Sequence, residues 1–110
     1  MKDTSKDLII QHIVNQRAFF ATNKTRDINF RLEQLRKLKK AILNSQKKIE
    51  DALWEDLHKS PEESYLTEIS IVTGEINNHI KHLKRWAKPE RVATPLHLWP
   101  SSSKVMYEPL

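Results

Sequence analysis

The apolar residues of this chain divide it into three helical stretches followed by an extended tail. Between Ser5 and Thr22 they recur at roughly helical spacing, which predicts a first helix there. Thr4 and Asp7 are placed to act as its cap and as the acidic partner at the helix start. Asn23 follows, and asparagine tolerates the left-handed backbone conformation in which helices often end.

The segment 27–58 has the most regular pattern. It contains neither proline nor glycine, and its remaining positions are mostly Lys, Arg, Gln and Glu, which are strong helix formers. The pattern predicts one continuous helix, about 48 Å long at 1.5 Å per residue. A single apolar stripe runs along it, formed by Ile28, Leu32, Leu35, Leu38, Ile42, Ile49, Leu53 and Leu57.

A third helix is predicted to begin at Ser60-Pro61-Glu62-Glu63. The serine can cap the helix, the proline suits the first helical position, and the second glutamate occupies the capping-box position. Pro89 limits the helix at its other end. Because the connection after His58 is short, the second and third helices are expected to form an antiparallel hairpin. Gly74 lies inside the third helix. It either allows another backbone to approach the helix closely or has no structural role. The apolar stripe comprises Leu66, Ile69, Val72, Thr73, Ile76, Ile80, Leu83 and Ala87.

After Pro89 the character of the chain changes. Residues 96–99 and 105–108 are short strand-like runs, and the Pro-Ser-Ser-Ser sequence between them indicates a turn. An isolated hairpin is marginal in water, so its packing partner is expected from outside this segment. The predicted fold class is mainly α, with an N-terminal helix, a long antiparallel helical hairpin and a β-hairpin-like tail. The predicted division is into a helical segment, residues 1–89, and a tail, residues 90–110.

Composition removes most kinds of chemistry. The chain of 110 residues has no cysteine, hence no disulfide, thiolate zinc site or cysteine nucleophile. Its single glycine excludes the glycine-rich loops that bind phosphates. The first residues lack the pattern of a signal peptide and no run is long enough to cross a membrane, so a cytoplasmic location is expected. No catalytic, cofactor-binding or metal-binding residue is predicted within these 110 residues.

Two polar clusters nevertheless deserve an interpretation. Glu75, His79 and His82 lie along one side of the third helix, as a metal site would require, although three ligands from one helix without supporting groups make a poor site. The basic stretch 81–86, and the lysines between 37 and 48, are able to contact phosphates. However, 14 acidic residues are interleaved with 19 basic ones, at a net charge of +5, which is typical of solvated helix faces.

Several short motifs together resemble one known family. They are Arg17-Ala18-Phe19-Phe20, Lys24-Thr25-Arg26, the F-R-x-x-Q-L stretch at 30–35, Ala52-Leu53-Trp54-Glu55-Asp56-Leu57-His58-Lys59, Glu68, Glu75-Ile76, Leu83-Lys84-Arg85-Trp86-Ala87 and Tyr107-Glu108-Pro109-Leu110. In this combination they resemble the N-terminal region of the aldehyde dehydrogenase superfamily, with most similarity to its class 3 or fatty-aldehyde branch. One departure is Asn23, where the family often has glycine before K-T-R.

The resemblance implies a larger enzyme that oxidises an aldehyde to a carboxylate with NAD or NADP. The family places its catalytic cysteine, asparagine and glutamate after the E-P-L motif, so none is carried over to this chain. It further implies that the helices pack on the coenzyme-binding domain and that residues 90–110 add strands to the sheet through which subunits associate. A homodimer is expected, because the apolar helix stripes and the unpaired strand edge are available to a second copy. In the class 3 branch a face of the third helix also lies near the mouth of the aldehyde tunnel. Thr67 and Ile71 stand where such contacts would be expected, but they match no family motif and are not predicted as site residues.

Two hypotheses remain at this point. The chain is either a non-catalytic N-terminal fragment of an aldehyde dehydrogenase or an independent basic helical module that binds nucleic acid or a partner helix. The incomplete hairpin at the end of the sequence favours the fragment, because a self-contained module is not expected to stop on unpaired strands.

Overall fold

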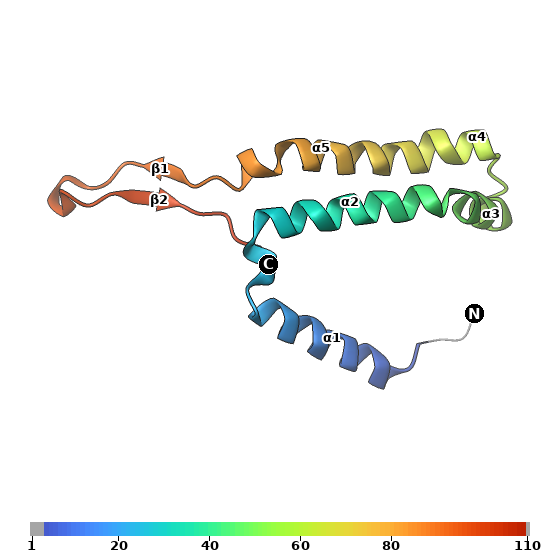
Figure 1. Cartoon of the computed structure of the whole chain (residues 1–110), viewed down its shortest axis with the longest axis horizontal. Helices are drawn as coiled ribbons and strands as arrows, with labels where there is room; N and C mark the ends of the chain where they lie inside the picture. The colour runs from blue at the N-terminus through green and yellow to red at the C-terminus, as the bar shows by residue number, and fades with distance from the viewer. Residues whose placement is uncertain (1–3, 110) are drawn as a thin grey trace.

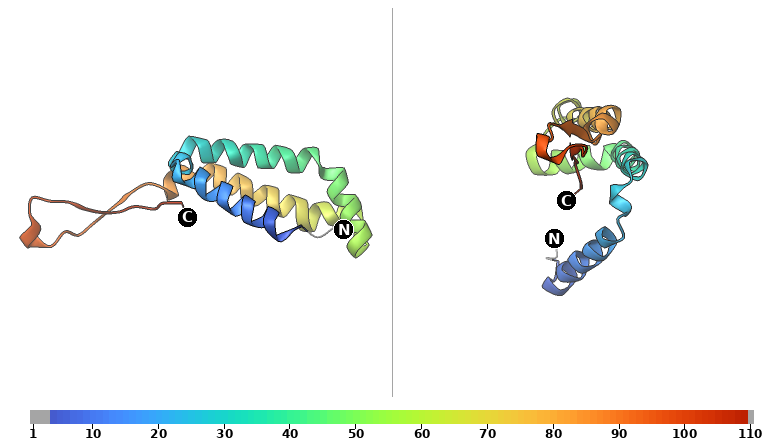
Figure 2. Two further views of the ribbon diagram at one scale, coloured as in Figure 1. Left: turned by 90° about the horizontal axis from the view of Figure 1, so that it is seen from below. Right: turned by 90° about the vertical axis from the view of Figure 1, so that its left-hand side faces the viewer.

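The computed structural model describes residues 4–109, so residues 1–3 and Leu110 of the E-P-L motif lie outside the described part. Helices α2 and α5 lie side by side, a two-stranded hairpin projects beyond one end of them, and α1 stands apart (Figures 1 and 2). The predicted class, mainly α with a hairpin tail, is confirmed. The elements are α1 (Lys6–Ala21), η1 (Lys24–Arg26), α2 (Ile28–Asn44), α3 (Gln46–Leu57), α4 (Pro61–Ser64), η2 (Tyr65–Ile69), α5 (Ser70–Trp86), β1 (Glu90–Val92), η3 (Leu96–Leu98) and β2 (Ser103–Val105).

The first helix begins one residue later than predicted. Ser5, and not Thr4, is the cap, and its hydroxyl accepts a hydrogen bond from the amide of Leu8 at 3.3 Å. At the other end Asn23 adopts the left-handed conformation with φ of 60°, as predicted. Every described residue of α1 is exposed, because most of its contacts with the rest of the chain are made at its C-terminal end, near the η1 turn.

The prediction of one helix over 27–58 is wrong, because the helix divides at Ser45. The amide of Ser45 still bonds to the carbonyls of Ala41 and Ile42, but the backbone of Ser45 leaves the helical region. Helix α3 then turns across the end of the helical hairpin formed by α2 and α5 (Figure 1). The predicted apolar stripe has no member between Ile42 and Ile49, so no stripe residue holds this turn against α5. Serine also competes with helical bonding through its own hydroxyl, which favours a break at this position.

The third helix starts as predicted but is not uniform. Ser60 caps it by accepting from the amide of Glu63 at 3.1 Å, and Pro61 is the first helical residue. The segment η2 then winds as a π-helix before α5 continues in the same direction. Helices α2 and α5 are antiparallel, as expected. Apart from its own helix backbone and its chain neighbours, no atom of the described residues lies within 4 Å of where a side chain on Gly74 would begin, so the close approach of another backbone is not found.

The tail forms an antiparallel pair, in which Glu90, Arg91 and Val92 face Val105, Lys104 and Ser103. The predicted strand at 96–99 is wrong. Residues Leu96–Leu98 form a 3₁₀ turn at the tip, where the amides of Leu98 and Trp99 bond to the carbonyls of Pro95 and Leu96. Prolines at 95 and 100 flank this run, and proline cannot donate to a strand ladder. The second predicted strand enters the sheet only at Val105.

The core is small for a chain of this length. Among the described residues the buried apolar side chains are Leu32 of α2, Ile69 of η2 and Ile76 of α5, and the polar side chain of Ser64 in α4 is fully buried. The radius of gyration is 20.4 Å, whereas a compact domain of this length has one of about 13 Å. The chain is therefore an extended scaffold that leaves much of its apolar surface uncovered.

Candidate interaction surfaces

The candidate metal ligands do not converge. The ring nitrogen Nδ1 of His79 lies 2.9 Å from the carbonyl oxygen of Glu75 and 3.2 Å from its carboxylate, while His82 Nδ1 lies 2.8 Å from Oδ1 of Asn78. Both imidazole rings pack on Trp86, with ring centroids 5.3 and 5.5 Å away. No three His, Cys, Asp or Glu side chains within residues 4–109 are arranged to hold a metal ion.

Two of the motifs that carry the family resemblance meet in space. Arg26 of the K-T-R motif donates from Nη2 to Oε2 of Glu108 in the E-P motif, at 2.9 Å, although the two residues are far apart in sequence. The guanidinium of Arg31 donates to the carbonyls of Thr25 and Arg26 and so fixes the η1 turn from which Arg26 projects. A pocket of about 220 Å³ lies at this junction between the helices and the returning tail, and its lining includes Met106.

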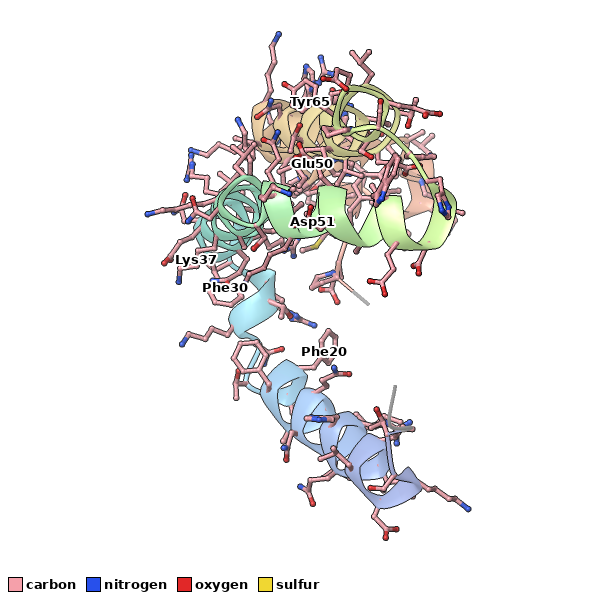
Figure 3. All side chains as sticks on the ribbon, turned by 90° about the vertical axis from the view of Figure 1, so that its right-hand side faces the viewer. Phe20, Phe30, Lys37, Glu50, Asp51 and Tyr65 are labelled. Atoms are coloured by element: carbon pink, nitrogen blue, oxygen red, sulfur yellow. The ribbon has the colours of Figure 1, made fainter. Side chains whose placement is uncertain are left out.

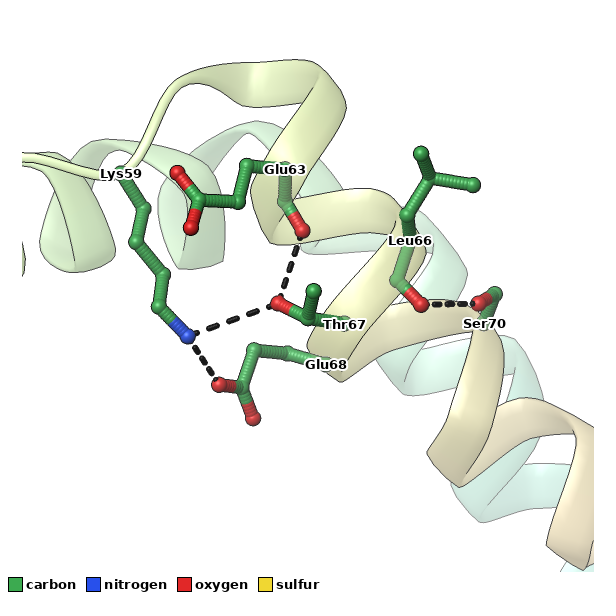
Figure 4. Close-up of polar contacts among 6 residues, drawn as sticks. All are labelled: Lys59, Glu63, Leu66, Thr67, Glu68 and Ser70. Carbon is green, nitrogen blue, oxygen red and sulfur yellow. Dashed lines mark hydrogen bonds and ion pairs between the residues drawn. The ribbon is translucent and has the colours of Figure 1, made fainter.

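A second pair of motif residues meets at the loop between α3 and α4. Lys59, the last residue of the D-L-H-K motif, forms an ion pair with Glu68 of η2 (Figure 4). Its Nζ also lies 3.4 Å from Oγ1 of Thr67. Only 21% of the Lys59 side chain is exposed, so this ion pair is better shielded from solvent than the contact at Glu108. The loop is thereby fixed to the helix that follows it.

An apolar surface runs along the side of the helical hairpin. Two adjoining grooves of about 490 and 400 Å³ lie between α2 and α5 and share Leu35 and His79 in their linings. The charged side chains among the lining residues are Arg31 and Glu75. Such a surface is typical of one that another protein surface covers. The apolar lining residues are Phe30, Leu35, Leu38, Ile71, Val72, Ile76 and Leu83.

Helix α1 adds a second uncovered surface. Phe20 projects into the space between α1 and the helical hairpin (Figure 3), and an open groove of about 660 Å³ lies beside it. The rings of Phe19 and Phe30 are 5.9 Å apart and form a contact between α1 and α2. The exposed apolar residues of α1 are Leu8, Ile9, Ile10, Ile13, Val14, Phe19 and Phe20.

Comparison with known proteins identifies what these surfaces belong to. No family model matches the chain. It is 45% identical over 103 residues to the 4,4'-diaponeurosporen-aldehyde dehydrogenase of Staphylococcus aureus, which covers 94% of this chain and 22% of that protein. It is 36% identical over 93 residues to aldehyde dehydrogenase family 3 member B1 of Homo sapiens, covering 84% of this chain and 20% of that protein. The chain is a homologue of the class 3 aldehyde dehydrogenases.

A solved structure gives the same result for the fold. The chain matches a structure described as the substrate-bound state of Staphylococcus aureus AldH with a TM-score of 0.83 and 45% identity, over 89% of this chain and 21% of that one. The chain thus spans about a fifth of the length of the class 3 relatives.

Sequence reasoning recognised the class 3 motifs but missed that they pair with each other. The charges at Arg26 and Glu108, and at Lys59 and Glu68, were the available signal, since each pair joins opposite charges. Nothing in the local pattern links Arg26 to Glu108, which are 82 residues apart, and the pairing of Lys59 with Glu68 depends on the loop that separates them.

Proposed function

We propose that this chain is the N-terminal, non-catalytic part of an enzyme that oxidises an aldehyde to a carboxylate with NAD or NADP. The observation that carries the proposal is the match of nearly the whole chain to class 3 aldehyde dehydrogenases, of which it spans only about a fifth. The uncovered groove between α2 and α5 supports it, because an independent module is expected to bury such a surface itself.

The two predicted segments have separate roles in this proposal. Residues 1–89 pack on the coenzyme-binding domain through the groove between α2 and α5 and through α1. Residues 90–110 contribute strands to the sheet that joins two subunits of a homodimer. The outer edges of β1 and β2 are unpaired within residues 4–109, which supports a role in pairing with further strands. A cytoplasmic location stays a prediction. None of the helices in the described part combines the length and apolar character needed to cross a bilayer.

A chimeric enzyme tests the proposal. This chain would replace the matching region of the Staphylococcus aureus relative, and formation of reduced coenzyme from NAD or NADP would be followed with an aldehyde substrate. We expect an active, soluble chimera. Ile71→Asp, which places a carboxylate in the groove, should lower activity and yield, whereas Lys40→Asp, an exposed position outside the groove lining, should not. An inactive chimera that is nevertheless folded would count against the proposal.

The isolated chain provides a complementary test. It should neither bind NAD nor reduce it in the presence of aldehydes, and calorimetric titration showing micromolar binding would contradict the proposal. Its affinity for nucleic acid should be weak and nonspecific at physiological salt. Submicromolar, sequence-selective binding in a gel-shift assay would instead support an independent basic module.

Self-association follows from the same uncovered surfaces. The isolated chain of 13.0 kDa should form dimers or larger species at micromolar concentration, because an unpaired strand edge and an apolar groove are both available to a second copy. Light scattering distinguishes the outcomes. A stable, well-folded monomer would show that the helices close their own core, against the proposed packing on another domain.

A further inference from the structure

The π-helical turn η2 has an unusual set of hydrogen bonds. The amide of Ser70 donates to the carbonyl of Tyr65, five residues back, instead of to that of Leu66, four residues back. The Leu66 carbonyl accepts from the hydroxyl of Ser70 at 2.9 Å (Figure 4). The side chain of Ser70 thus occupies the carbonyl that its own amide would use in a regular α-helix.

The wide turn decides which residues face the core. Ser64 and Ile69 are 0% and 2% exposed, so both point inward. In a continuous α-helix, residues five apart lie about 140° apart around the axis and do not share a narrow buried face. A turn closed by a bond to the fifth preceding residue holds one extra residue, which brings Ser64 and Ile69 to the same side.

A regular α-helix would put a different residue at the buried position. Tyr65, four residues before Ile69, would then replace Ser64 on the inner face. Ser64 is fully enclosed, and a tyrosine ring does not fit the space of a serine without displacing its neighbours. The α-helical register therefore conflicts with the packing around position 64, while the π-helical register leaves Tyr65 partly exposed.

An ion pair fixes the two sides of the turn. Lys59 precedes α4, and its partner Glu68 lies within η2, so the contact spans all of α4. A change of register would rotate α4 relative to α5 and carry Lys59 away from Glu68. The hydroxyl of Thr67 bonds to the Glu63 carbonyl at 2.8 Å and adds a further link between α4 and the turn.

We propose that η2 is a register-setting element in which Ser70 and the ion pair between Lys59 and Glu68 hold one extra residue in the helix. It fixes the orientation of α4, and through it α3, on α5. It also keeps Leu66, which is 66% exposed, on the outer surface.

Single-residue deletions test this inference by thermal unfolding of the 110-residue chain. Deleting Leu66 removes the extra residue and leaves Ser64 and Ile69 four residues apart, on one face of a regular helix. The melting temperature should then stay within about 8 °C of the parent value. The matched control deletes Gly74, which has no side chain to lose. Its removal rotates Ile76 by about 100° around the helix axis, away from the face that carries Ile69. This control should lose cooperative unfolding. Equal damage from the two deletions would overturn the proposal.

Hydrogen exchange over residues 60–72 provides a readout that does not depend on a cooperative transition. Ser70→Ala should raise exchange in this segment about five-fold, as expected for the loss of about 1 kcal/mol. Thr73→Val is the matched control. The Thr73 hydroxyl bonds to the Ile69 carbonyl, which does not accept the π-helical amide bond, so its loss should raise hydrogen exchange less than Ser70→Ala does. In the chain lacking Leu66, Ser70→Ala should leave hydrogen exchange in this segment unchanged. The proposal would be overturned if Ser70→Ala raised exchange equally with and without Leu66, or if it did not raise exchange in the parent chain.

Discussion

Two neighbouring isoleucines separate the chain's own core from the surface proposed to pack on another domain. Ile69 is 2% exposed, whereas Ile71, at the start of α5, is 63% exposed and lines the groove. Replacement by alanine removes the same atoms from both. For Ile69 the lost burial and the resulting cavity should cost about 2–5 kcal/mol. For Ile71 only about a third of the side chain is covered, so roughly a third of the 1.5–3 kcal/mol for full burial, about 0.5–1 kcal/mol, is expected.

Urea unfolding followed by helical circular dichroism measures both variants. In the isolated chain Ile69→Ala should lower the midpoint strongly and Ile71→Ala only slightly. In the chimeric enzyme the effect of Ile71→Ala should increase, because the groove is then covered. If Ile71→Ala is as costly as Ile69→Ala in the isolated chain, the groove is already closed there and the reasoning from exposure fails. If the isolated chain shows no cooperative transition, the comparison is made in the chimera.

Three further predictions concern polar contacts. Arg26→Glu or Glu108→Arg alone should lower the free energy of unfolding by up to about 1 kcal/mol, and the double exchange should restore it at low salt, because this exposed ion pair is screened; additive losses in a double-mutant cycle would refute it. Ser64→Ala should be neutral or stabilising in urea unfolding, because the enclosed hydroxyl has no hydrogen-bond partner among the described residues; a large loss would reveal a missing partner. The hydrogen bond and charge of Lys37 lower the pKa of Glu33 below 4.5. This pair should therefore stabilise α2 at higher pH, and the stabilisation should be lost as the pH falls through the lowered pKa of Glu33. In an acid titration followed by circular dichroism, the parent should lose this contribution to helix stability, whereas Glu33→Gln, which lacks the carboxylate, should not.

The features predicted correctly from the sequence are those that local chemistry determines. Asn23 takes the left-handed conformation and Ser60 caps the helix that begins at Pro61, since each depends on residues within one turn. The antiparallel pairing of α2 and α5 was also predicted, from the short connection after His58, although α3 and α4 turned out to lie between the two helices. The family could be recognised because its motifs are spread over most of the chain.

The errors arise where tertiary packing overrides a local pattern. Ser45 interrupts a segment whose composition is helical throughout, because α3 packs across the end of the hairpin. The extra residue at η2 was missed because the enclosure of Ser64 is not visible in a hydrophobic pattern that skips serine. Residues 96–99 have strand-like composition but lie at the tip of the hairpin between two prolines.

Two pairs of charged residues from the family motifs link separate segments of the chain. Arg26 with Glu108 joins the end of the tail to the η1 turn, which also carries α1, and Lys59 with Glu68 joins the loop after α3 to the helix leading into α5. These contacts add to what the small core provides in positioning α1, the groove and the β-hairpin. A segment with two uncovered apolar surfaces, the groove and α1, and little core of its own is suited to be covered by other surfaces, which agrees with the proposed place within a larger enzyme.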